Sequence, residues 1–322
     1  MPHPVSLSTQ QPTADQRTGA PAWLPVFVSP AGQAETFAAY DRVLHQWLVP
    51  YTERDVPTSF GQTHVIVSGA EDAPPIVFLH ALYATAAVWY PNAGPLSRHY
   101  RTFAVDVIGE PNKSRPTRHP ATPDDFAQWF AEVLDGLGID RTYLVGNSFG
   151  AFLSVYFALQ LPQRVRRLVL IGPAATFHQI VPFYVHLFGP KLLSMLLPRL
   201  PGLRRLVRHS LEWLRNGLPL DPAWGELFYL TLLYGSGANP LFPRVYAPVE
   251  LGRVTTPTLL LIGDRERIYR PADAIRVAER AMPNLRWEMV PQAHHITALA
   301  QPGIVNDRIE RFFSEDRVES GC

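Results

Sequence analysis

The sequence predicts an α/β fold in which helices cover both faces of a parallel sheet and a helical segment is inserted late in the chain. From residue 75 to residue 171, continuous apolar runs alternate with helical patterns. This rhythm stops between residues 174 and 248 and resumes from 257 to 313. Apolar strands that alternate with helices are typical of parallel sheets buried on both faces.

Composition sets the outer limits. The chain has 322 residues, which fits one large domain with an insertion as well as two domains. Its 47% hydrophobic and 18% charged residues indicate a globular protein with a sizeable core. A net charge of +1 gives no reason to expect a nucleic-acid partner. The single cysteine, Cys322, allows neither a disulfide framework nor a thiolate metal site.

The two ends of the chain are predicted to lie outside the core. Residues 1–25 are rich in Pro, Ser, Thr and Gln, and we expect residues 1–28 to be a disordered or loosely packed tail. They lack the charged start and apolar centre of a signal peptide, and no apolar run in the chain is long enough to span a bilayer. We therefore expect a cytoplasmic protein without stable membrane insertion. Residues 315–322 are predicted to be a C-terminal tail.

The first elements follow from local patterns. A serine and a proline at 29–30 are typical of an N-cap and first helical position, and apolar residues recur at helical spacing as far as Trp47. Residues 51–57 and 62–68 alternate like two neighbouring strands. Residues 75–80 are continuously apolar, which predicts a strand covered on both faces.

Strands and helices then alternate up to residue 171. We expect, in order, a helix within 85–99, a strand at 102–107, a loop at 109–123, a helix at 124–137, a strand at 141–145, a helix at 152–160 and a strand at 165–171.

The insertion is predicted to be a helical cap. Residues 174–248 are rich in Leu, Phe, Trp, Tyr and Arg, contain many prolines and show no strand pattern. Beyond them we expect strands at 257–262 and 285–290 and helices at 271–281 and 302–313. The core would thus consist of residues 29–173 and 249–314, with 174–248 as a cap or lid.

One motif carries a chemical signal. The apolar run 142–145 ends at Gly146, and Ser148 follows with Gly150 two positions further on, just before a helical pattern. A G-x-S-x-G sequence between a strand and a helix is typical of a sharp turn that exposes a nucleophilic serine. The alternative is an ordinary strand–helix turn in which the serine caps the helix.

A nucleophilic serine needs a base and a group that orients the base. Asp264 and Glu266 follow one later strand, and His294 and His295 follow the next. Each of these residues, taken alone, is typical of a solvated loop. Together with Ser148 they stand at the carboxyl ends of strands in the chain order serine, acid, histidine, which predicts a catalytic triad.

These residues resemble the α/β-hydrolases. The similarity extends from about residue 36 to 313 and is strongest to a bacterial carboxylesterase-like branch, whose members have stretches similar to 89–92, 104–109 and 111–114 of this chain. The resemblance implies an eight-stranded, mostly parallel sheet with a helical lid. It also implies hydrolysis of an ester without a metal or organic cofactor.

The family pattern selects between the paired candidates. The family's histidine stands six places before a Gln-Pro pair, and Gln301 stands six places after His295. His294 is then a neighbour at the pocket rim. The family's acid usually stands three residues after the glycine that ends its strand, which is Gly263 here, and this spacing selects Glu266 over Asp264.

The resemblance also implies an oxyanion hole made of two backbone N–H groups. One belongs to Phe149, the residue after the serine, and the other to Leu82, in the loop after the third strand. Ala81 and Ala151 stand where the family often has glycine. An alanine is compatible with these positions only where φ is negative.

The predicted function is therefore hydrolysis of a small to medium apolar carboxylic ester through an acyl-enzyme. Two alternatives remain at this point: hydrolysis of a C–C bond in a ring-cleavage diketone, and a ligand-binding protein that has lost catalysis. The cap also has a set of basic residues that form either a solvated face or a contact with a membrane surface or acidic substrate. These are Lys191, Arg199, Arg204, Arg205, Arg208 and Arg215.

Overall fold

The computed structural model describes residues 22–196, 201–237 and 241–319. The expectations for residues 1–21, for Arg199 and for residues 320–322 lie outside these ranges. Within them, nine strands form a single sheet. The strands are β1 (Tyr51–Thr58), β2 (Gly61–Ser68), β3 (Pro75–Leu79), β4 (Arg101–Val105), β5 (Arg115–Pro116), β6 (Thr142–Asn147), β7 (Val165–Ile171), β8 (Thr258–Gly263) and β9 (Leu285–Val290).

The sheet is mostly parallel, as expected. Its order is β1-β2-β4-β3-β6-β7-β8-β9, and the short strand β5 pairs with β2 beside this path. The pairs of β2 with β1, β4 and β5 are antiparallel, and all pairs from β4 to β9 are parallel. The expected eight strands thus form the continuous path. The ninth, β5, falls in the segment that we expected to be a loop.

Helices occupy most of the segments between strands. They are α1 (Pro30–Leu44), α2 (Tyr90–Leu96), α3 (Pro123–Gly136), α4 (Phe149–Gln160), α5 (Val181–Phe183), α6 (Gly189–Leu196), α7 (Leu203–Arg215), α8 (Pro222–Tyr234), α9 (Pro248–Leu251), α10 (Pro271–Ala281), α11 (Thr297–Ala300) and α12 (Pro302–Glu319). Shorter helical turns are η1 (Ala86–Trp89), η2 (Pro162–Arg164) and η3 (Tyr184–Phe188).

The start of α1 shows how local sequence sets an element. The Ser29 side chain accepts a hydrogen bond from the N–H of Gly32 at 3.1 Å, and Pro30 is the first helical residue. Proline has no N–H, and at this position a helix has no partner for one. The N-cap predicted from these two residues is confirmed.

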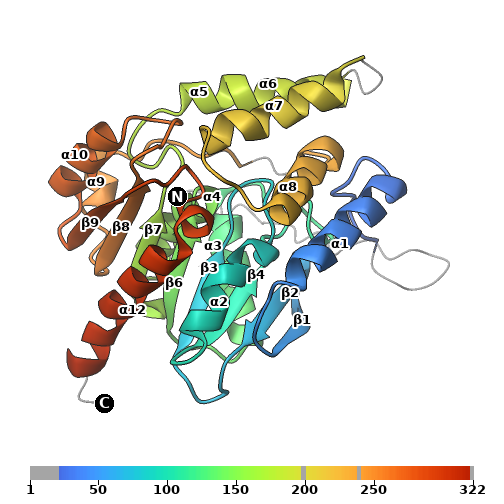
Figure 1. The fold of residues 1–322 in the computed structure, drawn as a ribbon. Coiled ribbons are helices and arrows are strands. Elements are labelled where there is room, and N and C mark those ends of the chain that lie inside the picture. The colour runs from blue at the N-terminus through green and yellow to red at the C-terminus, as the bar shows by residue number, and fades with distance from the viewer. Residues whose placement is uncertain (1–21, 197–200, 238–240, 320–322) are drawn as a thin grey trace, which may run out of the picture.

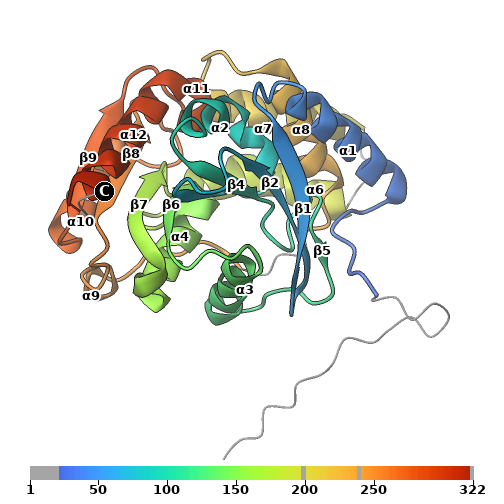
Figure 2. The same ribbon diagram turned by 90° about the horizontal axis from the view of Figure 1, so that it is seen from below.

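The core helices lie on two faces of the sheet. On one face α3 and α4 pack against each other, and on the other α2 packs against α12 (Figure 2). Aromatic rings fill the space between the sheet and these helices. Phe130 of α3 stacks on Phe157 of α4 at 4.2 Å between ring centroids, and Tyr143 of β6 stacks on Phe313 of α12 at 4.4 Å.

The segment predicted as a cap contains α5, η3, α6, α7 and α8 and, in its described part, no strand. Figure 1 shows α5, α6 and α7 above one end of the sheet, while α8 lies beside α1. The segment leaves the core after β7 and returns before β8. These two strands pair directly, with Leu168 opposite Thr258.

The N-terminal boundary differs from the prediction. Part of the predicted loose tail, residues 22–28, packs against the protein. The N–H of Val28 donates to the carbonyl of Tyr234 at 2.8 Å, and Phe27 forms an isolated bridge with Gly235. Phe27 is 7% exposed because its ring lies edge-on to Phe37 of α1. The prediction grouped these apolar residues with the polar residues before them and therefore placed the boundary too late.

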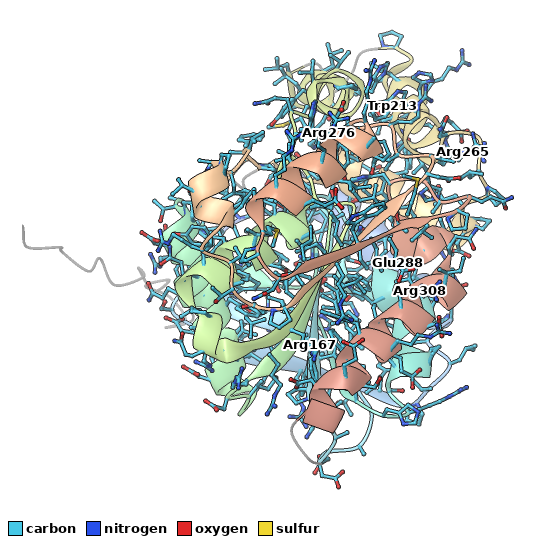
Figure 3. The ribbon with its side chains drawn as sticks, turned by 90° about the vertical axis from the view of Figure 1, so that its left-hand side faces the viewer. Arg167, Trp213, Arg265, Arg276, Glu288 and Arg308 are labelled. Atoms are coloured by element: carbon cyan, nitrogen blue, oxygen red, sulfur yellow. The ribbon has the colours of Figure 1, made fainter. Side chains whose placement is uncertain are left out.

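The C-terminal boundary also differs, because α12 continues to Glu319 through the predicted tail. Beyond residue 314, Glu315 accepts hydrogen bonds from the guanidinium groups of Arg167 and Arg286. Arg167 lies on β7, and Figure 3 shows it beside the end of α12, with Glu288 of β9 next to Arg308 further along the helix. Ion pairs of Glu315 and Arg308 thus connect the last helix to the sheet, and the helical pattern alone did not reveal them.

Candidate active site

Ser148 stands at the sharp turn between β6 and α4. Its φ of 53° and ψ of −109° are strained for a residue with a side chain. The flanking glycines are required by close contacts. A Cβ on Gly150 would lie 2.1 Å from the carbonyl oxygen of Leu79, and one on Gly146 would lie 2.5 Å from the backbone nitrogen of Ala151. The turn therefore has the geometry of a nucleophile elbow.

The turn is fixed to the neighbouring strand β7. The N–H of Ser148 donates to the carbonyl of Ile171 at 2.9 Å, and the side-chain amide of Asn147 donates to the same oxygen at 3.0 Å. Two donors on one acceptor hold the strained backbone in place. The serine side chain is consequently aimed by the sheet itself.

His295 connects the serine to an acid. Its Nε2 lies 2.7 Å from Oγ of Ser148, and its Nδ1 lies 2.6 Å from Oε2 of Glu266. A carboxylate only accepts hydrogen bonds, so Nδ1 carries the proton and Nε2 is left to accept the serine hydroxyl. Ser148 is 3% exposed and His295 is 2% exposed. The structure thus brings the three predicted side chains into one buried hydrogen-bonded chain.

The second oxygen of Glu266 is anchored by the backbone. Its Oε1 accepts the N–H groups of Arg267 and Ile268, each at 2.8 Å. These two bonds fix the orientation of the carboxylate toward the imidazole of His295.

The two competing residues lie nearby and make other contacts. The exposed Asp264 accepts the N–H of Ala293 through Oδ1 at 3.2 Å. The ring of His294 accepts the N–H of Ile296 at 3.1 Å and is fully buried, so it is not at a pocket rim as expected. Burial and the neighbouring His295 lower the pKa of His294 to about 4.

The loop after β3 is ordered by His80. Its Nδ1 donates to the carbonyl of Ala81 at 2.8 Å, and its Nε2 accepts the N–H of Val107 at 2.9 Å. Neither Ala81 nor Ala151 is among the described residues with positive φ. The condition under which alanine replaces glycine at these two positions is therefore met.

The two predicted oxyanion donors lie on segments that touch. A Cβ on Gly150 would lie 2.8 Å from the carbonyl oxygen of His80, so the start of α4 approaches the loop that carries Leu82. Phe149 is the first residue of α4. The first N–H groups of a helix have no acceptor within it, which leaves such a group available to a ligand.

A pocket between the cap and the core reaches this loop. Its volume is about 200 Å³. Its lining consists of Leu82, Tyr83, Gly109, Glu110, Pro111, Phe188, Lys191, Leu192, Met195, Gly237, Leu241 and Phe242. Most of these side chains are apolar, as predicted for a lid that covers an apolar substrate.

The basic residues of the cap do not share one environment in the structure. Lys191 lies in the pocket, is 2% exposed and donates a hydrogen bond to the carbonyl of Gly235. It is therefore not part of a solvated face. Arg204, Arg205 and Arg208 of α7 are exposed.

Two residues beside the site were not identified from the sequence. Glu110 is 1% exposed, and its Oε2 accepts the N–H of Tyr83 at 2.8 Å. A charged residue in a loop of prolines and charges gave no sign of burial. The sequence also gave no sign of the φ of 56° at Tyr83, because residues other than glycine seldom adopt a positive φ.

Within the described ranges, no group of three or more His, Cys, Asp or Glu side chains is arranged to hold a metal ion. The same ranges contain no helix that is both long and apolar enough to cross a membrane.

Comparison with known proteins gives the family. The sequence model of the α/β hydrolase fold matches residues 74–208. The uncharacterized carboxylesterase nap of Bacillus subtilis is 36% identical over 287 residues, which cover 87% of this chain and 92% of that protein. The carboxylesterase YbfK of the same organism is 33% identical over 288 residues, or 86% and 92% of the two chains.

A solved structure agrees over almost the same length. The crystal structure of naproxen esterase (carboxylesterase NP) from Bacillus subtilis superposes with a TM-score of 0.80 at 34% identity, and the match covers 89% of this chain and 99% of the other. Sequence, sheet order and the turn at Ser148 point the same way. The chain belongs to the α/β-hydrolase family, in its bacterial carboxylesterase-like branch.

Proposed function

We propose that this protein is a serine hydrolase that cleaves carboxylic esters of small to medium apolar substrates. The observation that carries the proposal is the hydrogen-bonded chain from Ser148 through His295 to Glu266. The carboxylesterase names of the two Bacillus relatives support the same reaction.

In the proposed first half-reaction, Oγ of Ser148 attacks the ester carbonyl while Nε2 of His295 takes the hydroxyl proton. Glu266 holds the imidazole in the required tautomer and stabilises its positive charge. The carbonyl oxygen becomes an oxyanion that accepts the N–H groups of Leu82 and Phe149. Each such donor contributes about 3 kcal/mol to transition-state stabilisation. Collapse of the tetrahedral intermediate breaks the ester C–O bond, and His295 protonates the departing alkoxide.

The second half-reaction regenerates the enzyme. His295 removes a proton from water, and the resulting oxygen attacks the acyl-enzyme carbonyl. The second tetrahedral intermediate releases the carboxylic acid and returns the proton to Ser148. The side chains of this chain supply every proton transfer in the scheme.

We also propose the cytoplasm as its location and small-molecule esters as its partners, without nucleic acid. A single cysteine is compatible with a reducing compartment, which supports the location.

Three experiments test the proposal. A fluorophosphonate probe should label the wild-type protein and leave Ser148→Ala unlabelled, because only an activated serine reacts. A panel of nitrophenyl esters beside a ring-cleavage diketone separates ester from C–C hydrolysis, since both reactions use the same triad. Ser148→Ala should lose more than about 10⁴-fold in kcat with an unchanged Tm. Retained turnover in this variant would remove the serine from the mechanism, and an unlabelled wild type would favour a non-catalytic protein.

A further inference from the structure

A buried carboxylate holds the backbone next to the proposed oxyanion hole. Glu110 lies in the loop after β4, directly after Gly109, and is 1% exposed. Its Oε2 accepts the N–H of Tyr83 at 2.8 Å. This N–H belongs to the peptide group between Leu82 and Tyr83, which directly follows the peptide group that carries the N–H of Leu82. A hydrogen bond to a charged group is about twice as strong as one between neutral groups.

This carboxylate stabilises a strained residue. Tyr83 has a φ of 56°, which costs a bulky side chain on the order of 1–3 kcal/mol. Such a conformation persists only where its surroundings overdetermine it. The N–H of Tyr83 is held by Glu110, and its carbonyl accepts the hydroxyl of Thr231 on α8. The core therefore holds one side of the residue and the cap holds the other.

The cap also supplies the opposite charge. Lys191 of α6 donates to the carbonyl of Gly235, and its ammonium lies 5.7 Å from the centroid of the Tyr83 ring. Burial lowers the pKa of Lys191 to about 8, against the opposing effect of the negative charge on Glu110. Lys191 and Glu110 are thus buried groups of opposite charge that line the same pocket as Tyr83.

We propose that Glu110 is a positioning residue that sets the N–H of Leu82 for the oxyanion, and that the cap supports this setting through Thr231 and Lys191. The inference rests on the proposed function, because it assigns a cause to the geometry of that site. It adds a role for the cap: the cap completes the oxyanion hole as well as covering the substrate.

The physical reason is the short range of oxyanion stabilisation. The donor must lie about 2.7–3.1 Å from the oxygen of the tetrahedral intermediate. When the N–H of Tyr83 loses its acceptor Glu110, Tyr83 relaxes toward an ordinary φ. The peptide group between Leu82 and Tyr83 then rotates, and the N–H of Leu82 shifts with it. A displacement of about 1 Å at such a position costs about 100-fold in rate. Glu110 also lines the pocket under the cap, but leucine is close to glutamate in size, so the shape of the pocket is retained and KM should change little.

The central test compares two variants of the same chemistry. Glu110→Leu removes the acceptor of the Tyr83 N–H. Glu132→Leu is the matched control, because Glu132 accepts the N–H of Ser59 at 2.6 Å in the turn between β1 and β2. With a nitrophenyl ester, Glu110→Leu should lose about 100-fold in kcat while KM stays within about threefold. The control should remain within about twofold of wild type in both constants.

A rescue variant and an inhibitor separate positioning from loss of fold. Glu110→Gln retains an acceptor oxygen and should keep kcat within about tenfold of wild type. The affinity of a trifluoromethyl ketone, whose hemiketal oxygen occupies the hole, should fall in parallel with kcat across the variants. Thr231→Val should also lower kcat and the affinity for the ketone. It serves as the main variant if Glu110→Leu does not fold.

Hydrogen exchange at the Tyr83 amide gives a readout that does not depend on turnover. Exchange should accelerate in Glu110→Leu and stay as in wild type in Glu132→Leu. Faster exchange with unchanged kcat and inhibitor affinity would overturn the positioning role, as would a Glu110→Gln variant as impaired as Glu110→Leu. Absence of ester turnover in the wild type, or turnover that survives Ser148→Ala, would instead refute the proposed function.

Discussion

Nδ1 of His295 lies 2.6 Å from the carboxylate of Glu266, whereas Asp264, two residues earlier, accepts the N–H of Ala293. The two acids follow the same strand but face different partners. Glu266 points to the imidazole, and Asp264 ties the loop after β9 to the end of β8. This difference leads to the first prediction.

Glu266→Gln should lower kcat by about 10³- to 10⁴-fold, because an amide that donates to Nδ1 holds the imidazole in the wrong tautomer. Asp264→Asn should cost less than about tenfold, since it weakens one backbone contact of an exposed side chain. Steady-state kinetics on a nitrophenyl ester measure both. If the large loss appears in Asp264→Asn and the small one in Glu266→Gln, the acid of the triad has been misassigned.

The paired histidines give a second prediction. His295→Ala should be inactive, whereas His294→Gln should retain wild-type kcat within about tenfold. Since burial and His295 lower the pKa of His294 to about 4, its ring stays neutral through the usual assay range. The fall of kcat/KM toward acid pH should therefore be the same in His294→Gln and wild type. If the fall at acid pH disappeared in His294→Gln, it would belong to His294, and the assignment to His295 would be wrong.

The pocket under the cap predicts a preference for longer acyl chains. Burial of one more methylene contributes about 0.8 kcal/mol, or roughly fourfold in kcat/KM. Nitrophenyl acetate, propionate and butyrate should therefore form a rising series until the pocket of about 200 Å³ is full. A flat or falling series would exclude this apolar pocket as the acyl site.

A polar cluster in the core predicts a pH-dependent stability. The His64 ring lies between Asp106 and Glu53, at 2.9 and 2.8 Å. Burial disfavours its charge, but the hydrogen bonds to these two carboxylates outweigh burial and raise the pKa of His64 from 6.5 to about 9. A raised pKa stabilises the folded protein fully below about pH 6.5, and this contribution disappears as the pH rises through 9.

His64→Gln should therefore lose about 1–3 kcal/mol in the free energy of unfolding at pH 6.5 relative to wild type, and the difference should shrink by pH 9.5. His99→Gln is the control, because His99 is half-exposed and pairs with Glu310 at the surface. Urea unfolding at several pH values measures both. A His64→Gln difference that stays constant with pH would show that this histidine is not charged in the folded protein.

The succession of strands along the chain and the meeting of the three site residues followed from the sequence. Parallel strands share their carboxyl ends, so residues after β6, β8 and β9 come to one edge without knowledge of any loop. The family spacing from Gly263 and to Gln301 then selected Glu266 and His295. Their catalytic roles stay predictions until the variants are measured.

What escaped prediction depends on contacts between loops. Glu110 meets Tyr83 across 27 residues of chain, in a conformation that no local pattern encodes. Lys191 belongs to a run of basic residues that suggested a solvated face, and only its place in the pocket beside the Tyr83 ring shows its burial. In these two cases tertiary packing overrides the local signal. Residues 22–28 are a different case, because they are apolar but were grouped with the polar residues before them, and Phe27 adds a bridge to Gly235.

The direct pairing of β7 with β8 has an evolutionary consequence. Leu168 lies opposite Thr258, so the cap leaves and re-enters the core between two adjacent strands. Doubling the length of a flexible segment between fixed ends costs only about 0.6 kcal/mol. The cap can thus lengthen, shorten or diverge while Ser148, Glu266 and His295 stay in register. Lineages of this family are free to acquire new substrates by changing one continuous stretch of the gene and leaving the rest intact.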